Sequence, residues 1–221
     1  MRKSLTIAMD GPAGSGKSTV ARQIAEKMGY LFLNSGAMYR AVALLAVSAN
    51  VTCSDVEKLI ELAHGCRIDF ADNGKITLLN GEDVTDLIHT PEIDIAVAEI
   101  ARIPEVRKAM VKQQRRIGKD GGIVVEGRDV TTVVFPDAEV KFYLDASVQE
   151  RAKRRFLELQ AKKITCTIEQ IELEIRTRDE KDLSRAHSPL RTADDAIVVD
   201  TTDKTLNQVV EIIIKQIEAQ S

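Results

Sequence analysis

The sequence predicts an α/β protein with a doubly wound parallel sheet, helices on both of its faces and a small antiparallel insert. Five short apolar stretches alternate with stretches in which apolar residues recur at helical spacing. The short stretches are too uniformly apolar to have one wet face, which is typical of parallel strands buried on both sides. A segment with the residue pattern of a β-hairpin interrupts this alternation after the second strand. The five predicted strands are 4–10, 31–33, 123–125, 140–144 and 197–199.

Helices are predicted between and after these strands. The first runs from Lys17 to Met28, because apolar residues fall on one face of it and Gly29 is a natural stop. Proline at the first position of two later helices is favourable, since its missing N–H would have no helical partner there. The later helices are expected over 37–48, 55–64, 91–102, 104–119, 147–162, 168–183 and 206–218.

The antiparallel insert is predicted at residues 65–90. Two apolar stretches flank Asn73-Gly74, the residue pair typical of a type I′ hairpin turn. Asn80-Gly81 predicts a second tight turn. We expect this insert to pack beside the main sheet rather than within it. The core then consists of residues 1–64 and 91–221.

Composition excludes several classes of function. A chain of 221 residues with 44% hydrophobic and 29% charged residues can bury one sizeable core, and its net charge of −3 argues against a general nucleic-acid binder. No apolar run approaches the roughly 18 residues of a membrane span. Three cysteines without a C-x-x-C pair argue against zinc and a disulfide framework: Cys53, Cys66 and Cys166. We expect a cytoplasmic monomer with neither nucleic-acid nor membrane partners.

A phosphate-binding motif follows the first strand. The stretch from Gly11 to Ser18 reads G-x-x-x-x-G-K-[ST], with a strand before it and a helix after it. Its glycines allow positive φ angles, so that several N–H groups point inward around an anion. Lys17 is expected to reach the β- and γ-phosphates of a nucleoside triphosphate, and the Ser18 hydroxyl to ligate Mg²⁺. The predicted ATP-binding residues here are Gly11, Pro12, Ala13, Gly14, Ser15, Gly16, Lys17, Ser18 and Thr19.

Further polar clusters follow two other strands, at residues 34–40 and 126–129. In open α/β sheets, ligands bind beyond the carboxyl ends of the strands. Each cluster alone is ordinary turn chemistry. Because all of them fall at the same predicted edge as the phosphate motif, we expect this edge to be the active face.

Two helices near the C-terminus carry arginine clusters. Arg178, Asp182 and Arg185 have the spacing that places two guanidinium groups around a carboxylate on one helix face. A solvated charge run is the simpler interpretation, but here the cation precedes the anion, which is the poorer orientation for helix stability. Arginine suits bidentate phosphate clamps, so we interpret residues of about 151–186 as a lid over a phosphoryl group. The preceding helix adds Arg151, Arg154 and Arg155.

Along nearly its whole length the chain resembles the bacterial cytidylate kinases, which are P-loop nucleoside monophosphate kinases. The resemblance implies a three-layer P-loop fold and transfer of the γ-phosphoryl group of ATP to CMP or dCMP, with Mg²⁺, in pyrimidine nucleotide metabolism. The insert is similar to the extra substrate-side domain of this family. The matching segments are residues 10–18, 35–40, 104–107, 127–129, 133–137 and 178–182, with Arg185.

The resemblance also implies roles for individual residues. The nucleoside monophosphate would be held by Ser35, Arg40, Arg107, Arg128 and Asp129, and contacted from the closing helices by Arg178, Asp182 and Arg185. Charge in the transition state would be neutralised by Lys17, Arg128, Arg178 and Arg185. Arg154 would stack on the donor adenine and Arg155 contact a phosphate. The metal would be held by Ser18 and, through water, Glu126.

Three residues depart from the family pattern. Asn34 replaces the usual aspartate, Thr131 replaces a frequent glycine, and Ala98 stands where many members have a serine that helps to read cytosine. The last departure leaves the preference for CMP over UMP open.

The resemblance also implies a mechanism without a general base. The second phosphate pKa of a nucleoside monophosphate is about 6, so its acceptor oxygen is already deprotonated at pH 7. Two alternatives stay open at this stage. A small-metabolite kinase acting on an alcohol would need a carboxylate at the acceptor, for which Asp129 is the candidate. A GTP-dependent switch would carry N-K-x-D and D-x-x-G motifs, and the sequence contains neither.

Overall fold

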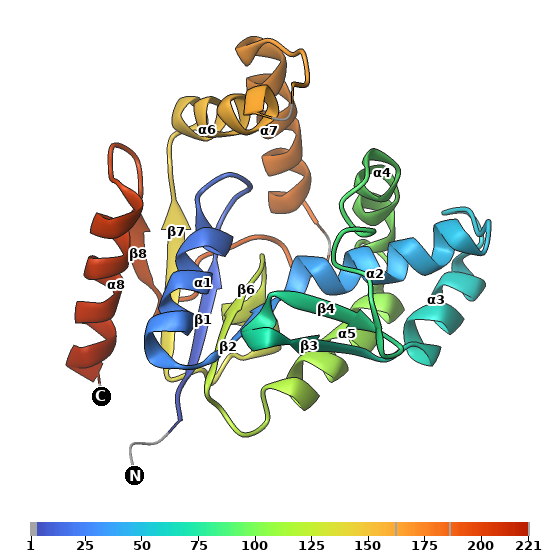
Figure 1. Ribbon diagram of the computed structural model, residues 1–221, viewed down its shortest axis with the longest axis horizontal. Coiled ribbons are helices and arrows are strands. Elements are labelled where there is room, and N and C mark those ends of the chain that lie inside the picture. The colour runs from blue at the N-terminus through green and yellow to red at the C-terminus, as the bar shows by residue number, and fades with distance from the viewer. Residues whose placement is uncertain (1–3, 162, 186, 221) are drawn as a thin grey trace. The chain divides into compact units, whose positions relative to one another are not determined.

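The computed structural model describes residues 4–161, 163–185 and 187–220. Its main sheet has five strands in the order β2-β6-β1-β7-β8 (Figure 1). β1 pairs in parallel with β7, and β7 in parallel with β8. The predicted α/β class and parallel core are confirmed. The strands are β1 (Thr6–Asp10), β2 (Leu31–Asn34), β6 (Ile123–Glu126), β7 (Val140–Asp145) and β8 (Ile197–Asp200).

The helices follow the predicted pattern. α1 and α7 have the predicted bounds, and α2 begins two residues earlier than expected because the Asn34 side chain accepts a hydrogen bond from Ala37 N (3.0 Å). The predicted end of α6 at residue 162 lies outside the described residues. The helices are α1 (Lys17–Met28), α2 (Ser35–Ser48), α3 (Val56–Gly65), α4 (Pro91–Ile100), α5 (Pro104–Ile117), α6 (Val148–Ala161), α7 (Ile168–Leu183) and α8 (Leu206–Gln220).

The chain forms two compact units. The first comprises Met1–Thr6 and Ala25–Val125, and the second comprises Ile7–Ile24 and Glu126–Ser221. Most of β1 lies in the second unit with β7, β8 and the phosphate motif, and the predicted insert lies in the first. The assignment of residues 65–90 as a separate domain stays a prediction.

The insert is a three-stranded antiparallel sheet of its own, with β3 (Ile68–Ala71), β4 (Ile76–Leu79) and β5 (Glu82–Asp83) in that order. Asn73 and Gly74 both have positive φ (54° and 89°), as a type I′ turn requires, and Lys75 N donates to Asp72 O (3.1 Å). Ala71 pairs with Ile76, so the loop, which contains a 3₁₀ turn (Asp72–Gly74), is longer than two residues. Asn80-Gly81 joins the paired residues Leu79 and Glu82 as a two-residue turn.

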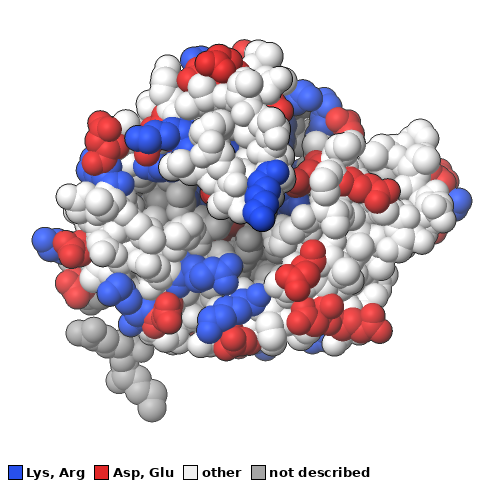
Figure 2. All heavy atoms as spheres, turned by 45° about the horizontal axis from the view of Figure 1, so that its top comes forward, with Lys and Arg blue, Asp and Glu red and all other residues white. Residues whose placement is uncertain are grey.

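Charged side chains of both signs are interspersed over the face shown in Figure 2. In the part of the chain that the structure describes, no helix is long and apolar enough to cross a membrane. β1 is fully buried at Ile7, Ala8 and Met9, as expected of a central parallel strand.

Candidate active site

The phosphate loop connects β1 to α1 within the second unit. Gly11, Gly14 and Gly16 all have positive φ, at 147°, 78° and 89°. At Gly11 a Cβ atom would lie 2.0 Å from Leu144 O in β7, so the backbone packs where no side chain fits. The loop geometry therefore requires the glycines that the motif predicts.

Lys17 is the first residue of α1 and is almost fully buried. Its Nζ donates to Pro12 O (2.7 Å) and to Ser15 Oγ (3.4 Å). The pKa of Lys17 is lowered to about 7, mainly by burial and also by repulsion from Arg128 and Arg178, while the carboxylates Glu126 and Asp10 oppose that shift. Two of the predicted catalytic arginines thus interact electrostatically with Lys17.

Ser18 and Glu126 are brought together as expected for a metal site. Ser18 Oγ donates to Glu126 Oε1 at 2.9 Å, and Glu126 is buried at the end of β6. Mg²⁺ is commonly held by one or two protein oxygens together with substrate phosphates and water. A hydroxyl and a carboxylate beside the phosphate loop fit that requirement. Among the described residues, no group of three or more His, Cys, Asp and Glu forms a metal cage.

Asp182 gathers two of the predicted arginines. Its Oδ2 accepts from Arg128 Nε at 2.9 Å, and its Oδ1 accepts from Arg185 Nη2. The expectation that Arg178, Asp182 and Arg185 share one helix face is wrong for Arg185, because α7 ends at Leu183. The carboxylate between two guanidinium groups exists nevertheless, with Arg128 coming from the segment after β6. Asp182 is 2% exposed, so its ion pairs are well shielded from solvent.

Asp10, at the end of β1, is a fully buried carboxylate. Its Oδ1 accepts from Val130 N (2.9 Å), and its Oδ2 accepts from Thr131 N (2.7 Å) and Thr131 Oγ1 (2.6 Å). These donors begin a π-helical segment, Val130–Val134, which the sequence did not predict; the buried Asp129 precedes it. This explains the threonine at position 131 in place of the frequent glycine: its hydroxyl donates to the Asp10 carboxylate, which would otherwise have one donor fewer.

Burial raises the pKa of Asp10 from its ordinary value of 3.8 to about 6, against the hydrogen bonds from Thr131 and Val130. The folded state then binds more protons than the unfolded state between these values, so ionisation of Asp10 lowers the free energy of unfolding as pH rises. We expect this decline to be missing in Asp10→Asn. The difference in free energy of unfolding between variant and wild type should shift in favour of the variant by about 2–3 kcal/mol from pH 4 to pH 7. Urea denaturation at both pH values measures it.

Asp195→Asn is the control for that experiment. Asp195 accepts a hydrogen bond from Lys141 Nζ at 2.7 Å, which holds its pKa below the ordinary value. The pH dependence of its variant should have the opposite sign. Equal pH dependence of Asp10→Asn and wild type would contradict the raised pKa of Asp10.

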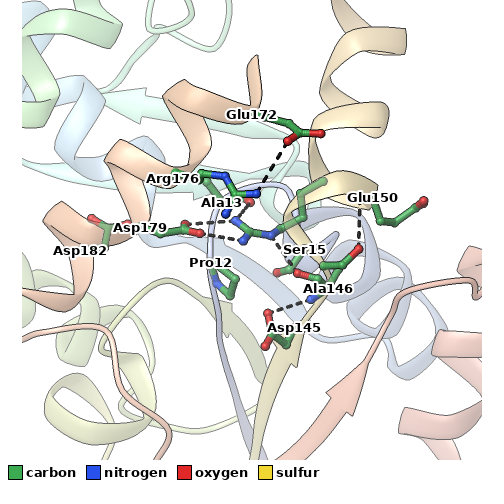
Figure 3. Close-up of polar contacts among 12 residues, drawn as sticks. Pro12, Ala13, Ser15, Asp145, Ala146, Glu150, Glu172, Arg176, Asp179 and Asp182 are labelled. Carbon is green, nitrogen blue, oxygen red and sulfur yellow. Dashed lines mark hydrogen bonds and ion pairs between the residues drawn. The ribbon is translucent and has the colours of Figure 1, made fainter. Parts of the chain in front are cut away.

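Arg151, which the sequence marked only as one of three neighbouring arginines, is the most buried of them and links α6 to the phosphate loop. Its Nε donates to Ala146 O (2.9 Å) and its Nη1 to Ala13 O (3.2 Å). Its guanidinium also forms a bidentate ion pair with Asp179 of α7, at 3.1 and 2.7 Å (Figure 3). Sequence reasoning missed this pair because its partners lie 28 residues apart on two helices.

The other two lid arginines differ from one another. Arg154 donates to Glu150 Oε1, to Thr201 Oγ1 and to Thr201 O, at 3.0, 3.0 and 2.7 Å. Arg155 is exposed and pairs with Glu158 at 3.2 Å. Their predicted contacts with ATP stay predictions.

The first unit contains the remaining predicted CMP-binding residues. Ser35 is the first residue of α2, and the N-terminus of a helix favours an anion. Arg40, on the same helix, donates from Nη1 to Ile88 O (3.0 Å) and pairs with Asp94 of α4. Arg107 of α5 lies over the ring of Tyr39 at 5.4 Å, so three predicted residues gather around α2. Their roles in binding CMP stay predictions.

The other two departures from the family pattern, Asn34 and Ala98, lie in the first unit. Asn34 caps α2 with the same oxygen that an aspartate would present, so this departure keeps the helix cap. Ala98 is exposed on α4.

Comparisons with known proteins agree with one another. The sequence profile of the cytidylate kinase family matches residues 7–219. A cytidylate kinase of Syntrophotalea carbinolica is 46% identical and covers 96% of this chain and 91% of its own length. A cytidylate kinase of Bacillus subtilis is 45% identical, with 100% of both chains covered. A solved structure of an uncharacterised protein from Eubacterium ventriosum has a TM-score of 0.51 at 11% identity, over 97% of this chain and 98% of that one, and this likeness concerns the fold alone.

Proposed function

The chain belongs to the cytidylate kinase family and transfers the γ-phosphoryl group of ATP to CMP or dCMP, giving CDP or dCDP and ADP; we propose that it does so with a donor site on the phosphate loop and an acceptor site rich in arginines. The two alternatives, a kinase acting on an alcohol and a GTP-dependent switch, are set aside by this membership. The geometry around Lys17 is the observation that carries the proposal.

In the donor site, we assign the triphosphate of ATP to residues 11–19. Lys17, held at the loop by Pro12 O, carries the charge that reaches the β- and γ-phosphates. Arg154 and Arg155 are assigned to the adenine and to a phosphate, as the resemblance implies. Both assignments follow from the family pattern.

For the acceptor site, we propose the CMP-binding residues that the resemblance implies. Asp182 supports this assignment, because one buried carboxylate orients both Arg128 and Arg185. The proposed CMP-binding residues are Ser35, Arg40, Arg107, Arg128, Asp129, Arg178, Asp182 and Arg185.

The chemistry follows from these charges. A phosphate oxygen of CMP forms the new bond to the γ-phosphorus while the bond from that phosphorus to the β,γ-bridging oxygen breaks, and ADP leaves. The acceptor oxygen is already ionised, so no residue has to remove a proton. Lys17, Arg128, Arg178 and Arg185 stabilise the charge on the equatorial oxygens of the transferring group. Ser18 and Glu126 would hold Mg²⁺, which neutralises phosphate charge when bound.

The cellular setting is part of the same proposal. We assign the protein to pyrimidine nucleotide metabolism in the cytoplasm, as a monomer with small nucleotides as its partners. Reduced thiols are typical of that compartment, and Cys53, Cys66 and Cys166 are all free thiols.

A turnover assay with ATP, Mg²⁺ and a panel of CMP, dCMP, UMP and AMP tests the function. We expect CMP and dCMP to be the best acceptors, with ADP formed only when an acceptor is present. The rates with UMP measure the preference for CMP over UMP, which Ala98 leaves open. Failure on every pyrimidine monophosphate would refute the proposal.

Asp129→Asn distinguishes acceptor binding from base catalysis. Because the acceptor phosphate needs no base, we expect KM for CMP to rise by about tenfold while kcat changes little, as for loss of one hydrogen bond to a charged group. A loss of kcat by several orders of magnitude at saturating CMP would instead identify Asp129 as a base. Initial rates over a CMP titration decide between the two.

A further inference from the structure

Three carbonyl groups of the phosphate loop each accept a side-chain hydrogen bond. Lys17 Nζ donates to Pro12 O (2.7 Å), Arg151 Nη1 to Ala13 O (3.2 Å) and Thr201 Oγ1 to Ser15 O (3.0 Å). In a planar trans peptide, the C=O and the N–H of the following residue point in opposite directions. Each of these bonds therefore also fixes the direction of one loop N–H group.

No sequence motif predicts the contact of Thr201 with the phosphate loop. It follows β8 directly, lies 186 residues from Ser15 and is 2% exposed. Its hydroxyl accepts from Arg154 Nη1 at 3.0 Å while it donates to Ser15 O. A hydroxyl has a single proton to donate. Because the hydroxyl accepts from Arg154, which has no acceptor atom, its one proton is donated to Ser15 O.

The backbone around Thr201 is fixed on two further sides. Thr201 N donates to Asp145 O at 2.8 Å, which continues the pairing of β8 with β7. Thr201 O accepts from Arg154 Nη2 at 2.7 Å, and Arg154 is itself held by Glu150. The hydroxyl thus acts from a rigid position at the end of the sheet.

We propose that Thr201 is a positioning residue for the phosphoryl donor: its hydroxyl holds the Ser15–Gly16 peptide so that the Gly16 N–H faces the phosphates of ATP. Gly16, with its positive φ of 89°, has the freedom to leave that orientation when the anchor is removed. Arg154 then contributes through Thr201 as well as through any contact with the nucleotide. The inference rests on the proposed role of the loop in binding ATP.

Thr201→Val tests the proposal, because it keeps the side-chain shape and removes the hydroxyl. We expect KM for ATP to rise about tenfold, as for the loss of one well-placed hydrogen bond, with KM for CMP unchanged. The dissociation constant of tripolyphosphate, measured by titration calorimetry, should rise by the same factor, because this probe has phosphates and no adenosine. Thr201→Ser keeps the hydroxyl and should restore both values.

Thr202→Val is the matched control. Thr202 Oγ1 accepts from Ser147 N at 3.0 Å, away from the loop, so the same substitution one residue later should leave KM for ATP and tripolyphosphate binding unchanged. If Thr201→Val does not fold, Thr201→Ala removes the same hydroxyl without placing a methyl group against Ser15 O, and the same changes are expected.

Two results would overturn the proposal. Weaker ATP binding with unchanged tripolyphosphate binding would place the effect of Thr201 on the adenosine, and a lower melting temperature with unchanged KM would make its role structural only. Tripolyphosphate binding requires no turnover. Absence of CMP kinase activity in the wild type would therefore count against the proposed function. The effect of Thr201 on tripolyphosphate binding could still be measured and interpreted.

Discussion

Lys17→Met is expected to lower kcat by about 10²–10³-fold, because it removes a preorganised charge from the γ-phosphoryl group in the transition state. The same change should leave the melting temperature unchanged or raise it. Lys17 is almost fully buried and its pKa is lowered to about 7 by burial, so the folded protein is destabilised by holding this charge. Methionine fills similar space without that charge. Steady-state kinetics and thermal unfolding of the same sample measure both effects.

Lys27→Met is the control, since Lys27 lies in the last turn of the same helix and is exposed. We expect wild-type kcat there. A loss of activity in Lys17→Met that is matched by a loss of stability would show that Lys17 supports the fold rather than the reaction. Opposite movements of activity and stability are what a functional site predicts, because function retains a charge that folding alone would disfavour.

The fold was predictable because its determinants are local. Apolar runs identify the strands and helical periodicity identifies α1 and α7, whose observed bounds match the prediction. The π-helical turn Val130–Val134 was not predictable in this way. It forms around the carboxylate of Asp10, 120 residues earlier in the chain, and no local pattern encodes such a partner.

The residues of the candidate site likewise fall into those that local spacing predicts and those that depend on distant contacts. The phosphate loop has a fixed spacing, so Lys17 and Ser18 could be named from the sequence. The contacts of Arg151, Asp179 and Thr201 could not be predicted, because they depend on which chain segments become neighbours. The expectation that Arg185 lies on the same helix face as Asp182 was wrong for a related reason. The i, i+7 spacing of Arg178 and Arg185 predicts one helix face only if the helix continues to Arg185, but α7 ends at Leu183 and Arg185 reaches Asp182 from outside the helix.

Gly74 connects the insert to β2 within the first unit, and this contact leads to the second large prediction. Its φ is +89°, and a Cβ atom there would lie 1.9 Å from Phe32 O in β2. Gly81 has nearly the same φ, +91°, with nothing within 4 Å of the corresponding position. The two glycines stand in two turns of the same small sheet. They therefore separate backbone strain from a clash with a neighbouring strand.

Gly81→Ala should lower the free energy of unfolding by about 1 kcal/mol, the cost of a left-handed conformation for an L-residue. Gly74→Ala should lower it by about 3 kcal/mol or more, because the turn or β2 must also move apart. β2 runs directly into Asn34 and Ser35, so Gly74→Ala should in addition raise KM for CMP severalfold without affecting KM for ATP. Urea denaturation and CMP titrations measure these effects. Equal destabilisation by the two substitutions would mean that the turn detaches from β2 at little cost, and the insert could then move independently of the strand that positions Ser35.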